Sequence, residues 1–400
     1  MSVGVHRFTS FSTNVRVHAG DDALDALLPE MRRLGATRVF VICGRSVASK
    51  TTLLQRMRAI LGECYAGEFT HIKKDAPLAD VIDAAQGARD QRADLLIAVG
   101  AGSVLKAVRV VAIALGEEGA LDQHATQYRN GGTAESPRLT QPKIPIFAVL
   151  TAATSAQNRG GAALKRDDGG PRLEFYDPKT RPRAIFWDSE ALRSAPASLA
   201  LSTGVGVYWR ALMSAGAIEQ ANPLVQASRI HAFRLARDAL GRLTDPHDTQ
   251  ARIDMCAAAL LQNRDEEDGG RPFDVHWVAR AVYALGAGLF NRVPHLDQGA
   301  THAVLTVPAI ECFADLCPDA VVEMGMALGL ARNNASVSNV IHAVQDVFAR
   351  VGLQTRLEGV SAEDGNQALA SAMFNFNADR TGQLRTHHDR LRAILQKVTS

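Results

Sequence analysis

The residues with the clearest chemical potential are two glycines and a serine in the segment Gly100-Ala101-Gly102-Ser103. Glycine lets the backbone approach a ligand closely and adopt dihedral angles that other residues avoid. The apolar run before this segment is typical of a strand, and the run after it is typical of a helix. Free amides at the start of that helix, its dipole and the Ser103 hydroxyl suit a phosphate or pyrophosphate. The segment therefore predicts a phosphate-binding turn, and the alternative is a plain connection between strand and helix.

Four cations suggest a second kind of site, for a negatively charged molecule. Lys106 and Arg109 are three residues apart on the predicted helix, so they share one face. Arg172 lies in a segment rich in Gly, Arg and Asp, and Arg210 lies on a later helix. We expect these side chains to form an anion-binding cleft in which Lys106, Arg109 and Arg172 bind the substrate. The alternative is that they are solvated cations on separate surfaces.

The first half of the chain alternates strand and helix patterns. Strands are predicted at 39–43, 95–99, 144–150 and 183–187, and helices at 21–34, 49–61, 77–92 and 103–115. Apolar strands separated by helices predict a mainly parallel sheet that is covered on both faces. Ligands of such sheets bind at the carboxyl ends of the strands. The polar segment 158–172 predicts a β-hairpin or a mobile flap, and 127–141 predicts a surface loop.

After Trp187 the pattern is almost entirely helical. We therefore predict two domains, an α/β domain over 1–187 and an all-α domain over 188–400. A cleft between two domains is the default place for a small-molecule site.

Composition excludes several other classes of protein. The 400 residues carry a net charge of +2, which provides no strong attraction to nucleic acid or to an anionic membrane. The five cysteines are scattered without zinc spacing, which predicts reduced thiols. The N-terminus lacks the regions of a signal peptide, and no apolar run approaches the length of a membrane span. We expect a cytoplasmic protein that acts on a small molecule.

This order of motifs resembles the iron-containing alcohol dehydrogenase superfamily, and within it the maleylacetate reductases. The segments that carry the resemblance are Gly100-Ala101-Gly102-Ser103, Leu150-Thr151-Ala152-Ala153-Thr154-Ser155 and Thr301-His302-Ala303-Val304. The resemblance implies a dehydroquinate synthase-like fold, with a Rossmann-like parallel sheet followed by helices, and a homodimer. It also implies NAD or NADP as cofactor. The residues that it assigns to the nucleotide are Gly100, Gly102, Ser103 and Val104 for the pyrophosphate, and Thr151 and Thr154 for the adenine and ribose side.

The positions that hold the metal in this family carry other residues here. The family uses one Asp and three His, and a divalent cation needs ligands of this kind. Aligned by motif, the Asp–His pair falls on Gly206 and Arg210, the His–His pair before Leu-Gly falls on Ala279 and Tyr283, and the last His falls on Gln298. A shifted alignment keeps one of them as His295. We therefore predict that the family's catalytic metal is absent.

Hydride transfer can proceed without a metal when another group stabilises the developing alkoxide and a side chain supplies the proton. We expect Arg210 to polarise a carbonyl group or grip a carboxylate, and Tyr283 or His295 to give the proton. A lone His302 on an apolar helix is more often a satisfied core residue, and His276 is more often a surface residue at a helix start. The predicted function is a metal-independent, NAD(P)-dependent reductase of a small anionic carbonyl compound. The alternatives are a non-redox lyase or dehydratase on the same scaffold, or a non-catalytic nucleotide- or metabolite-binding protein.

Overall fold

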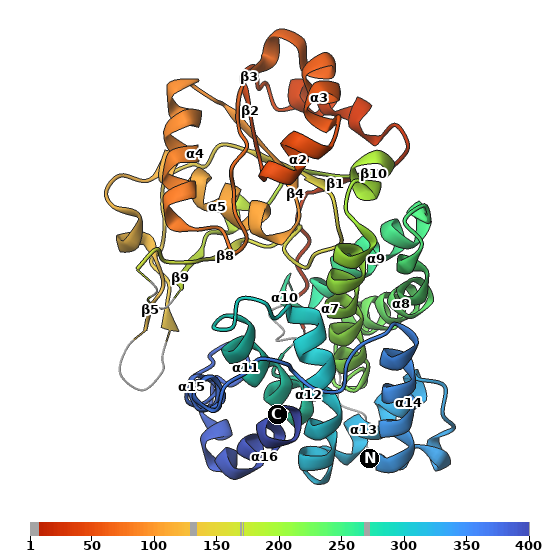
Figure 1. The fold of residues 1–400 in the computed structure, drawn as a ribbon. Coiled ribbons are helices and arrows are strands. Elements are labelled where there is room, and N and C mark those ends of the chain that lie inside the picture. Colours follow the sequence, from red (N-terminus) through yellow and green to blue (C-terminus); the bar gives the residue numbers. More distant parts are fainter. Residues whose placement is uncertain (1–7, 129–133, 169, 171, 268–272, 400) are drawn as a thin grey trace.

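A six-stranded parallel sheet forms the core of the first half of the chain. The computed structural model describes residues 8–128, 134–168, 170, 172–267 and 273–399 (Figure 1). The sheet has the order β1-β10-β7-β4-β2-β3, and all its pairs are parallel. Its strands are β1 (Arg16–Gly20), β2 (Val39–Cys43), β3 (Tyr65–Phe69), β4 (Leu95–Gly100), β7 (Ile146–Leu150) and β10 (Ala184–Asp188). The expected α/β architecture is confirmed.

Side chains of the inner strands alternate between two buried layers. In β4, Leu95, Ile97 and Val99 join one apolar cluster, whereas Leu96 and Ala98 join the other. This alternation is the period of two that a strand imposes. The helices of the first half are α1 (Leu27–Arg33), α2 (Arg45–Lys50), α3 (Leu53–Leu61), α4 (Leu78–Asp90) and α5 (Gly102–Gly116). Helices α1 and α3 contribute to the first cluster, and α4 and α5 contribute to the second. Both faces are therefore covered, which explains why these strands are continuously apolar.

Two small hairpins extend this half of the molecule. Strands β8 (Gly161–Leu164) and β9 (Leu173–Tyr176) pair antiparallel, so the segment expected to be a hairpin or a flap is a hairpin. Strands β5 (Gln127–Tyr128) and β6 (Ala134–Glu135) also pair antiparallel, in the segment predicted to be a surface loop.

The named elements after β10 are all helical. The α-helices are α6 (Ser189–Arg193), α7 (Ala197–Ala215), α8 (Pro223–Leu240), α9 (Thr249–Gln262), α10 (Arg264–Glu267), α11 (Trp277–Phe290), α12 (Gln298–Phe313), α13 (Pro318–Ala327), α14 (Val337–Arg350), α15 (Ala362–Ala372) and α16 (His388–Val398). Figure 1 shows the later helices gathered in the lower part of the view, below the sheet. The predicted domain boundary near residue 187 lies where β10 gives way to α6, and it stays a prediction. In the described parts of the chain, no helix has the length and apolar character needed to cross a membrane.

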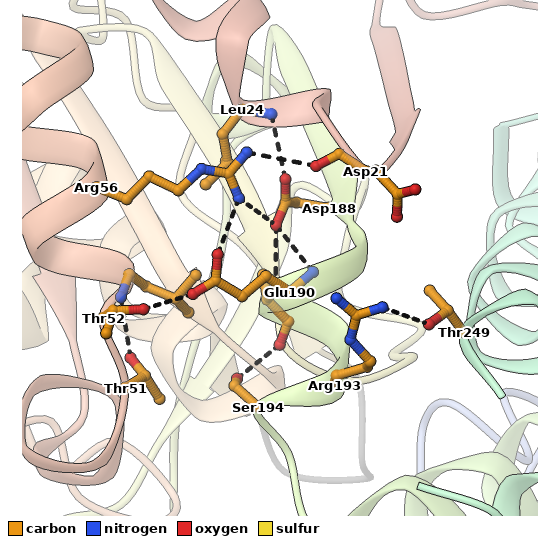
Figure 2. Close-up of polar contacts among 12 residues, drawn as sticks. Asp21, Leu24, Thr51, Thr52, Arg56, Asp188, Glu190, Arg193, Ser194 and Thr249 are labelled. Atoms are coloured by element: carbon orange, nitrogen blue, oxygen red, sulfur yellow. Dashed lines mark hydrogen bonds and ion pairs between the residues drawn. The ribbon is translucent and has the colours of Figure 1, made fainter. Parts of the chain in front are cut away.

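Asp188 anchors the point where the chain leaves the sheet (Figure 2). Its carboxylate is fully buried, and its Oδ1 accepts hydrogen bonds of 3.1 Å from the amides of Glu190 and Ala191 at the start of α6. Its Oδ2 accepts a bond from the Leu24 amide at 3.4 Å. Arg56 Nη1 of α3 lies 3.1 Å from the carboxylate and 3.2 Å from that of Glu190. Burial raises the pKa of Asp188 above its usual value, against the effect of these amides and of Arg56.

Candidate nucleotide and anion site

The glycine-rich turn connects β4 directly to α5, at the carboxyl edge of the sheet. A Cβ on Gly100 would lie 2.8 Å from Val104 Cγ2, so only glycine leaves this turn undisturbed. No side chain caps the amides of the first turn of α5. The Thr151 amide donates to the Gly100 carbonyl at 3.2 Å, which places the end of β7 beside the turn. Uncapped amides at a helix start, next to two strand ends, fit an anionic phosphate group.

The two threonines expected to face the nucleotide follow β7. Thr154 Oγ1 would lie 3.4 Å from a Cβ on Gly102, so the structure brings this side chain to the turn. The same oxygen accepts a hydrogen bond from the Ala156 amide at 3.1 Å, and Thr151 is buried. The structure thus gathers the predicted nucleotide residues in one place, and their role in binding stays a prediction.

Lys106 lies on α5, three residues after Ser103, and is half-buried. Its amine makes no hydrogen bond or ion pair with the residues that the structure describes. The pKa of Lys106 is lowered to about 8, chiefly by burial and next by the repulsion of Arg172. The carboxylate of Asp75 acts in the opposite direction. Arg109 and Arg159 add further repulsion. Positive charge is therefore in excess around this amine, and an anion would neutralise it.

Asp75 contacts this cationic group, and no sequence pattern identifies it as a site residue. Its Oδ1 lies 3.1 Å from Arg172 Nη2, and its amide donates to Ser103 Oγ at 3.0 Å. Asp75 and Ala76 have φ values of 67° and 51°, in the left-handed region that residues with a Cβ rarely adopt. The Lys165 amide of the hairpin holds this turn through bonds of 3.2 Å to both carbonyls. A strained turn held from outside is typical of functional sites.

Arg109 does not join this group in the way expected. Its side chain is 2% exposed, and it donates to the carbonyl oxygens of Ala156 and, at 3.1 Å, Gly161. It therefore braces the loop after β7 against the hairpin. This placement favours a structural role over contact with substrate, because buried guanidinium groups need such acceptors.

The expected catalytic residues separate into the buried Arg210 with the half-buried Tyr283, and a surface residue. Arg210 is 3% exposed and donates to Asn263 Oδ1 at 2.7 Å and to the Gln262 carbonyl at 2.8 Å. Its guanidinium lies 5.5 Å from the ring centre of Phe273, on which Tyr283 stacks at 3.7 Å. The structure thus brings Arg210 and Tyr283 to one ring.

His295 is exposed, and its Nε2 donates to the Glu358 carbonyl at 2.8 Å. The preceding residue, Pro294, accepts a bond of 2.8 Å from Lys74 Nζ. The turn that carries His295 therefore touches the loop that carries Asp75. Its catalytic role stays a prediction.

The residues at the family's metal positions do not fit a metal ion. Gly206 packs on Gly299, since a Cβ on Gly206 would lie 3.7 Å from the Gly299 Cα atom. Arg210, at the second of the metal positions, carries a buried positive charge. Gln298, at the last of them, is exposed. Within the described ranges, no three His, Cys, Asp or Glu side chains are grouped so that they could hold a metal ion. The donor set therefore argues against a metal in this place.

Two histidines of the helical half are buried, one of them against expectation. His276 begins α11 as expected but is buried, which corrects the predicted surface position. Its Nε2 donates to the Met213 carbonyl at 2.9 Å, its Nδ1 accepts from the Ala279 amide, and burial lowers its pKa to about 4. His302 is a core residue as expected, but neither ring nitrogen has a hydrogen-bond partner among the described residues. Its ring lies 4.0 Å from that of Trp209, and burial lowers its pKa to about 3.

The loop after β7 also bonds to the helical half. Asn263 Nδ2 donates to the Ser155 carbonyl, and Gln157 Nε2 donates to the Cys256 carbonyl, both at 2.8 Å. Two surface pockets, of about 330 and 520 Å³, are lined by other residues. These two hydrogen bonds, rather than either pocket, therefore mark the contact between the two halves.

Comparison with known proteins agrees with this architecture. Residues 14–189 match the family model for iron-containing alcohol dehydrogenase. A 4-hydroxybutyrate dehydrogenase from Cupriavidus necator is 26% identical, over 90% of this chain and 92% of its own. A maleylacetate reductase from Cupriavidus pinatubonensis is also 26% identical, over 86% and 84%.

Two solved structures share the fold over nearly all of both chains. A 1,3-propanediol oxidoreductase superposes with a TM-score of 0.82 at 20% identity, over 98% of this chain and 99% of its own. A sulfoacetaldehyde reductase from Bifidobacterium kashiwanohense, solved with NAD+, gives a TM-score of 0.78 at 17% identity, over 98% of both. Residues 14–189 are therefore related to the iron-containing alcohol dehydrogenases, and the relatives that cover most of the chain are named dehydrogenases and reductases, which makes the protein an oxidoreductase.

Proposed function

We propose that the protein is a nicotinamide-nucleotide-dependent reductase of a small carbonyl compound that carries an acid group. The observation that carries this proposal is an excess of positive charge near the glycine-rich turn. Lys106 lies one helical turn beyond that turn, and Arg172 approaches it from the hairpin. Hydroxybutyrate, maleylacetate and sulfoacetaldehyde, named in three of the relatives, are also acids. A half-buried ammonium without a protein partner favours an anionic ligand over a neutral one.

The chain's own residues divide the work of binding. The amides of Gly102, Ser103 and Val104 would hold the pyrophosphate, because they begin α5 without a side-chain cap. When bound, the nucleotide would supply a hydride to the carbonyl carbon. Arg172, fixed by Asp75, would hold the acid group of the substrate. We propose that no resident metal takes part, because the donor set at the family's metal positions does not suit one.

The test uses the full-length protein and two substrates that differ by one acid group. NADH and NADPH are first titrated by fluorescence, and nucleotide oxidation is then followed with 4-oxobutanoate and with butanal. We expect binding of a nucleotide and faster oxidation with 4-oxobutanoate, unchanged by a chelator. Binding without oxidation of any carbonyl compound would support the non-redox or non-catalytic alternatives, and no binding would overturn the proposal. Stoichiometric iron or zinc in the purified protein would overturn its metal-independent form.

The end of β2 suggests which nucleotide is preferred. In dinucleotide-binding folds, an acidic residue at the ribose binds its hydroxyl in NAD enzymes, and a nearby Arg accommodates the extra phosphate of NADP. Here β2 pairs in parallel with β4, so its carboxyl end lies beside the glycine-rich turn, and it is followed by Gly44 and the exposed Arg45 without an acidic side chain. We therefore propose a preference for NADP(H).

Replacing Arg45 tests this preference. Arg45→Ala should weaken NADPH binding about tenfold, the effect of losing roughly 1.4 kcal/mol of charge-assisted bonding, and leave NADH binding unchanged. Lys50→Ala, at the other end of the same short helix, is the matched control and should change neither affinity. Equal affinity of Arg45→Ala and the original protein for NADPH would contradict the assignment. The homodimer and the cytoplasmic location remain proposals that rest on the resemblance and on composition.

A further inference from the structure

We propose that Lys106 is the proton donor of this reductase, and that its half-buried ammonium group passes a proton to the carbonyl oxygen while Arg172 holds the acid group of the substrate. The inference rests on the proposed reductase function. It replaces Tyr283 and His295, which the sequence suggested for this step.

The position of Lys106 on α5 places the residue one helical turn beyond the proposed pyrophosphate site. A pyrophosphate on the first turn of α5 would lie against Gly102 and Ser103. Lys106 follows Ser103 by three residues, so both side chains lie on one face, separated by about one turn of 5.4 Å. Asp75 connects the two positions, since its amide bonds to Ser103 and its carboxylate pairs with Arg172.

The charges around Lys106 prepare it to release a proton. Asp75 comes from the loop before α4, Arg159 from the loop after β7, Arg172 from the hairpin and Arg109 from α5 itself. Only Asp75 favours the charged amine, and its carboxylate already pairs with Arg172. The resulting pKa of about 8 lies near neutral pH, where a general acid works best.

The other titratable groups near the two halves' contact are less suited to this step. Tyr283 stacks on Phe273 beside the buried Arg210 rather than on the glycine-rich turn, and an arginine keeps its proton. His276 uses both ring nitrogens in hydrogen bonds. His302 is enclosed, and its low pKa leaves it without a proton to give at neutral pH.

The step balances with the groups named. A hydride from the bound nucleotide reaches the carbonyl carbon, and the π electrons of the C=O bond move to oxygen. One N–H bond of the Lys106 ammonium breaks and an O–H bond forms, so the product is the alcohol and the amine is left neutral. Arg172 holds the acid group of the substrate throughout the step. A proton from water then restores the ammonium group.

The first experiment needs no substrate. The full-length protein is labelled with trace acetic anhydride between pH 6 and 11, and each lysine is quantified by mass spectrometry. We expect Lys106 to titrate near pH 8, below the value of about 10.4 that is ordinary for a lysine. Arg172→Gln should raise the midpoint of Lys106, and Asp75→Asn should lower it. Titration of Lys106 at the ordinary lysine value would overturn the proposal.

The second experiment separates proton donation from charge. Lys106→Arg keeps the positive charge but cannot give up a proton, so kcat should fall 100-fold or more while KM changes little. The kcat/KM of the original enzyme should decline as pH rises through about 8, and this decline should vanish in Lys106→Arg and in Lys106→Met. NADPH affinity should be unchanged in both variants.

Each failure has its own signature. Wild-type kcat in Lys106→Arg, in an enzyme that oxidises NADPH, would overturn the proton-donor role alone. Absence of both NADH and NADPH oxidation by the original protein with every carbonyl acid would overturn the proposed function and this inference together.

Discussion

At the scale of single residues, His302 is the polar side chain least matched to its surroundings. It is fully buried among Trp209, Tyr283 and Phe290, and its ring nitrogens lack hydrogen bonds to described residues. Its pKa is near 3 in the folded protein and about 6.5 in the unfolded chain. Between these values the unfolded chain binds more protons, so the free energy of unfolding should fall as pH falls from 6.5.

Replacing this histidine tests that dependence. His302→Phe should flatten the loss of Tm between pH 7.5 and 5, measured by circular dichroism, because one group that binds protons only on unfolding is removed. His276, with a pKa near 4, should leave part of the dependence in place. His342 is exposed, so His342→Phe is a control that should keep the original slope. An unchanged slope in His302→Phe would contradict the burial of a neutral imidazole.

Local sequence patterns predict the part of the candidate site that one continuous segment forms. The other part depends on contacts between residues that are distant in the sequence. Gly100, Gly102 and Ser103 were placed from sequence because one continuous segment makes the turn. Asp75 and its contact with Arg172 were missed, because the two residues meet only when the hairpin folds back on the loop before α4. Arg109 was assigned to substrate because residue spacing predicts which helix face it shares with Lys106. Spacing does not predict that the carbonyl groups of Ala156 and Gly161 accept its hydrogen bonds.

At the scale of elements, the crossing of α7 and α12 depends on one glycine. A Cβ on Gly299 would lie 2.3 Å from the Ser202 carbonyl oxygen and 2.9 Å from the Gly206 nitrogen. Gly299→Ala should therefore destabilise the protein by about 1–3 kcal/mol in urea unfolding, although alanine favours helix. Gly365 lies in α15 with nothing within 4 Å of its added Cβ, so Gly365→Ala should raise stability by up to about 1 kcal/mol. Equal effects of the two changes would contradict the close crossing.

The elements that sequence patterns missed are those with mixed exposure. Strand β1 is partly exposed along its length, and no residue of β3 is fully buried. Neither shows the continuous apolar run that identified β2, β4, β7 and β10, because each lies at an edge of the sheet. The fold class follows from the buried strands, whereas its edges depend on pairing partners far away in the chain.

At the scale of the whole molecule, Asn263 joins the two halves. It accepts from the buried Arg210 and donates to the Ser155 carbonyl in the loop after β7. Asn263→Ala should lower the free energy of unfolding by about 2–4 kcal/mol, because it leaves a buried guanidinium short of an acceptor and removes the bridge. Hydrogen exchange should also accelerate in the loop of Thr151 and Thr154. The exposed Asn377 offers a control, Asn377→Ala, which should leave both unchanged. Unaltered exchange in that loop would show that the bridge does not hold it.

The pairing of β1 sets the order in which this protein can fold as it is made. In the sheet, β1 has one neighbour, β10, and β10 begins at Ala184. At about 5–20 residues per second, a ribosome needs on the order of ten seconds to proceed from one strand to the other. Through that time β1 has no partner within the sheet. The exposed Phe8 and Phe11 precede it in the chain. Strand β1 is thus synthesised well before its neighbour in the sheet, and until Ala184 and the rest of β10 have been made it must be kept from pairing elsewhere.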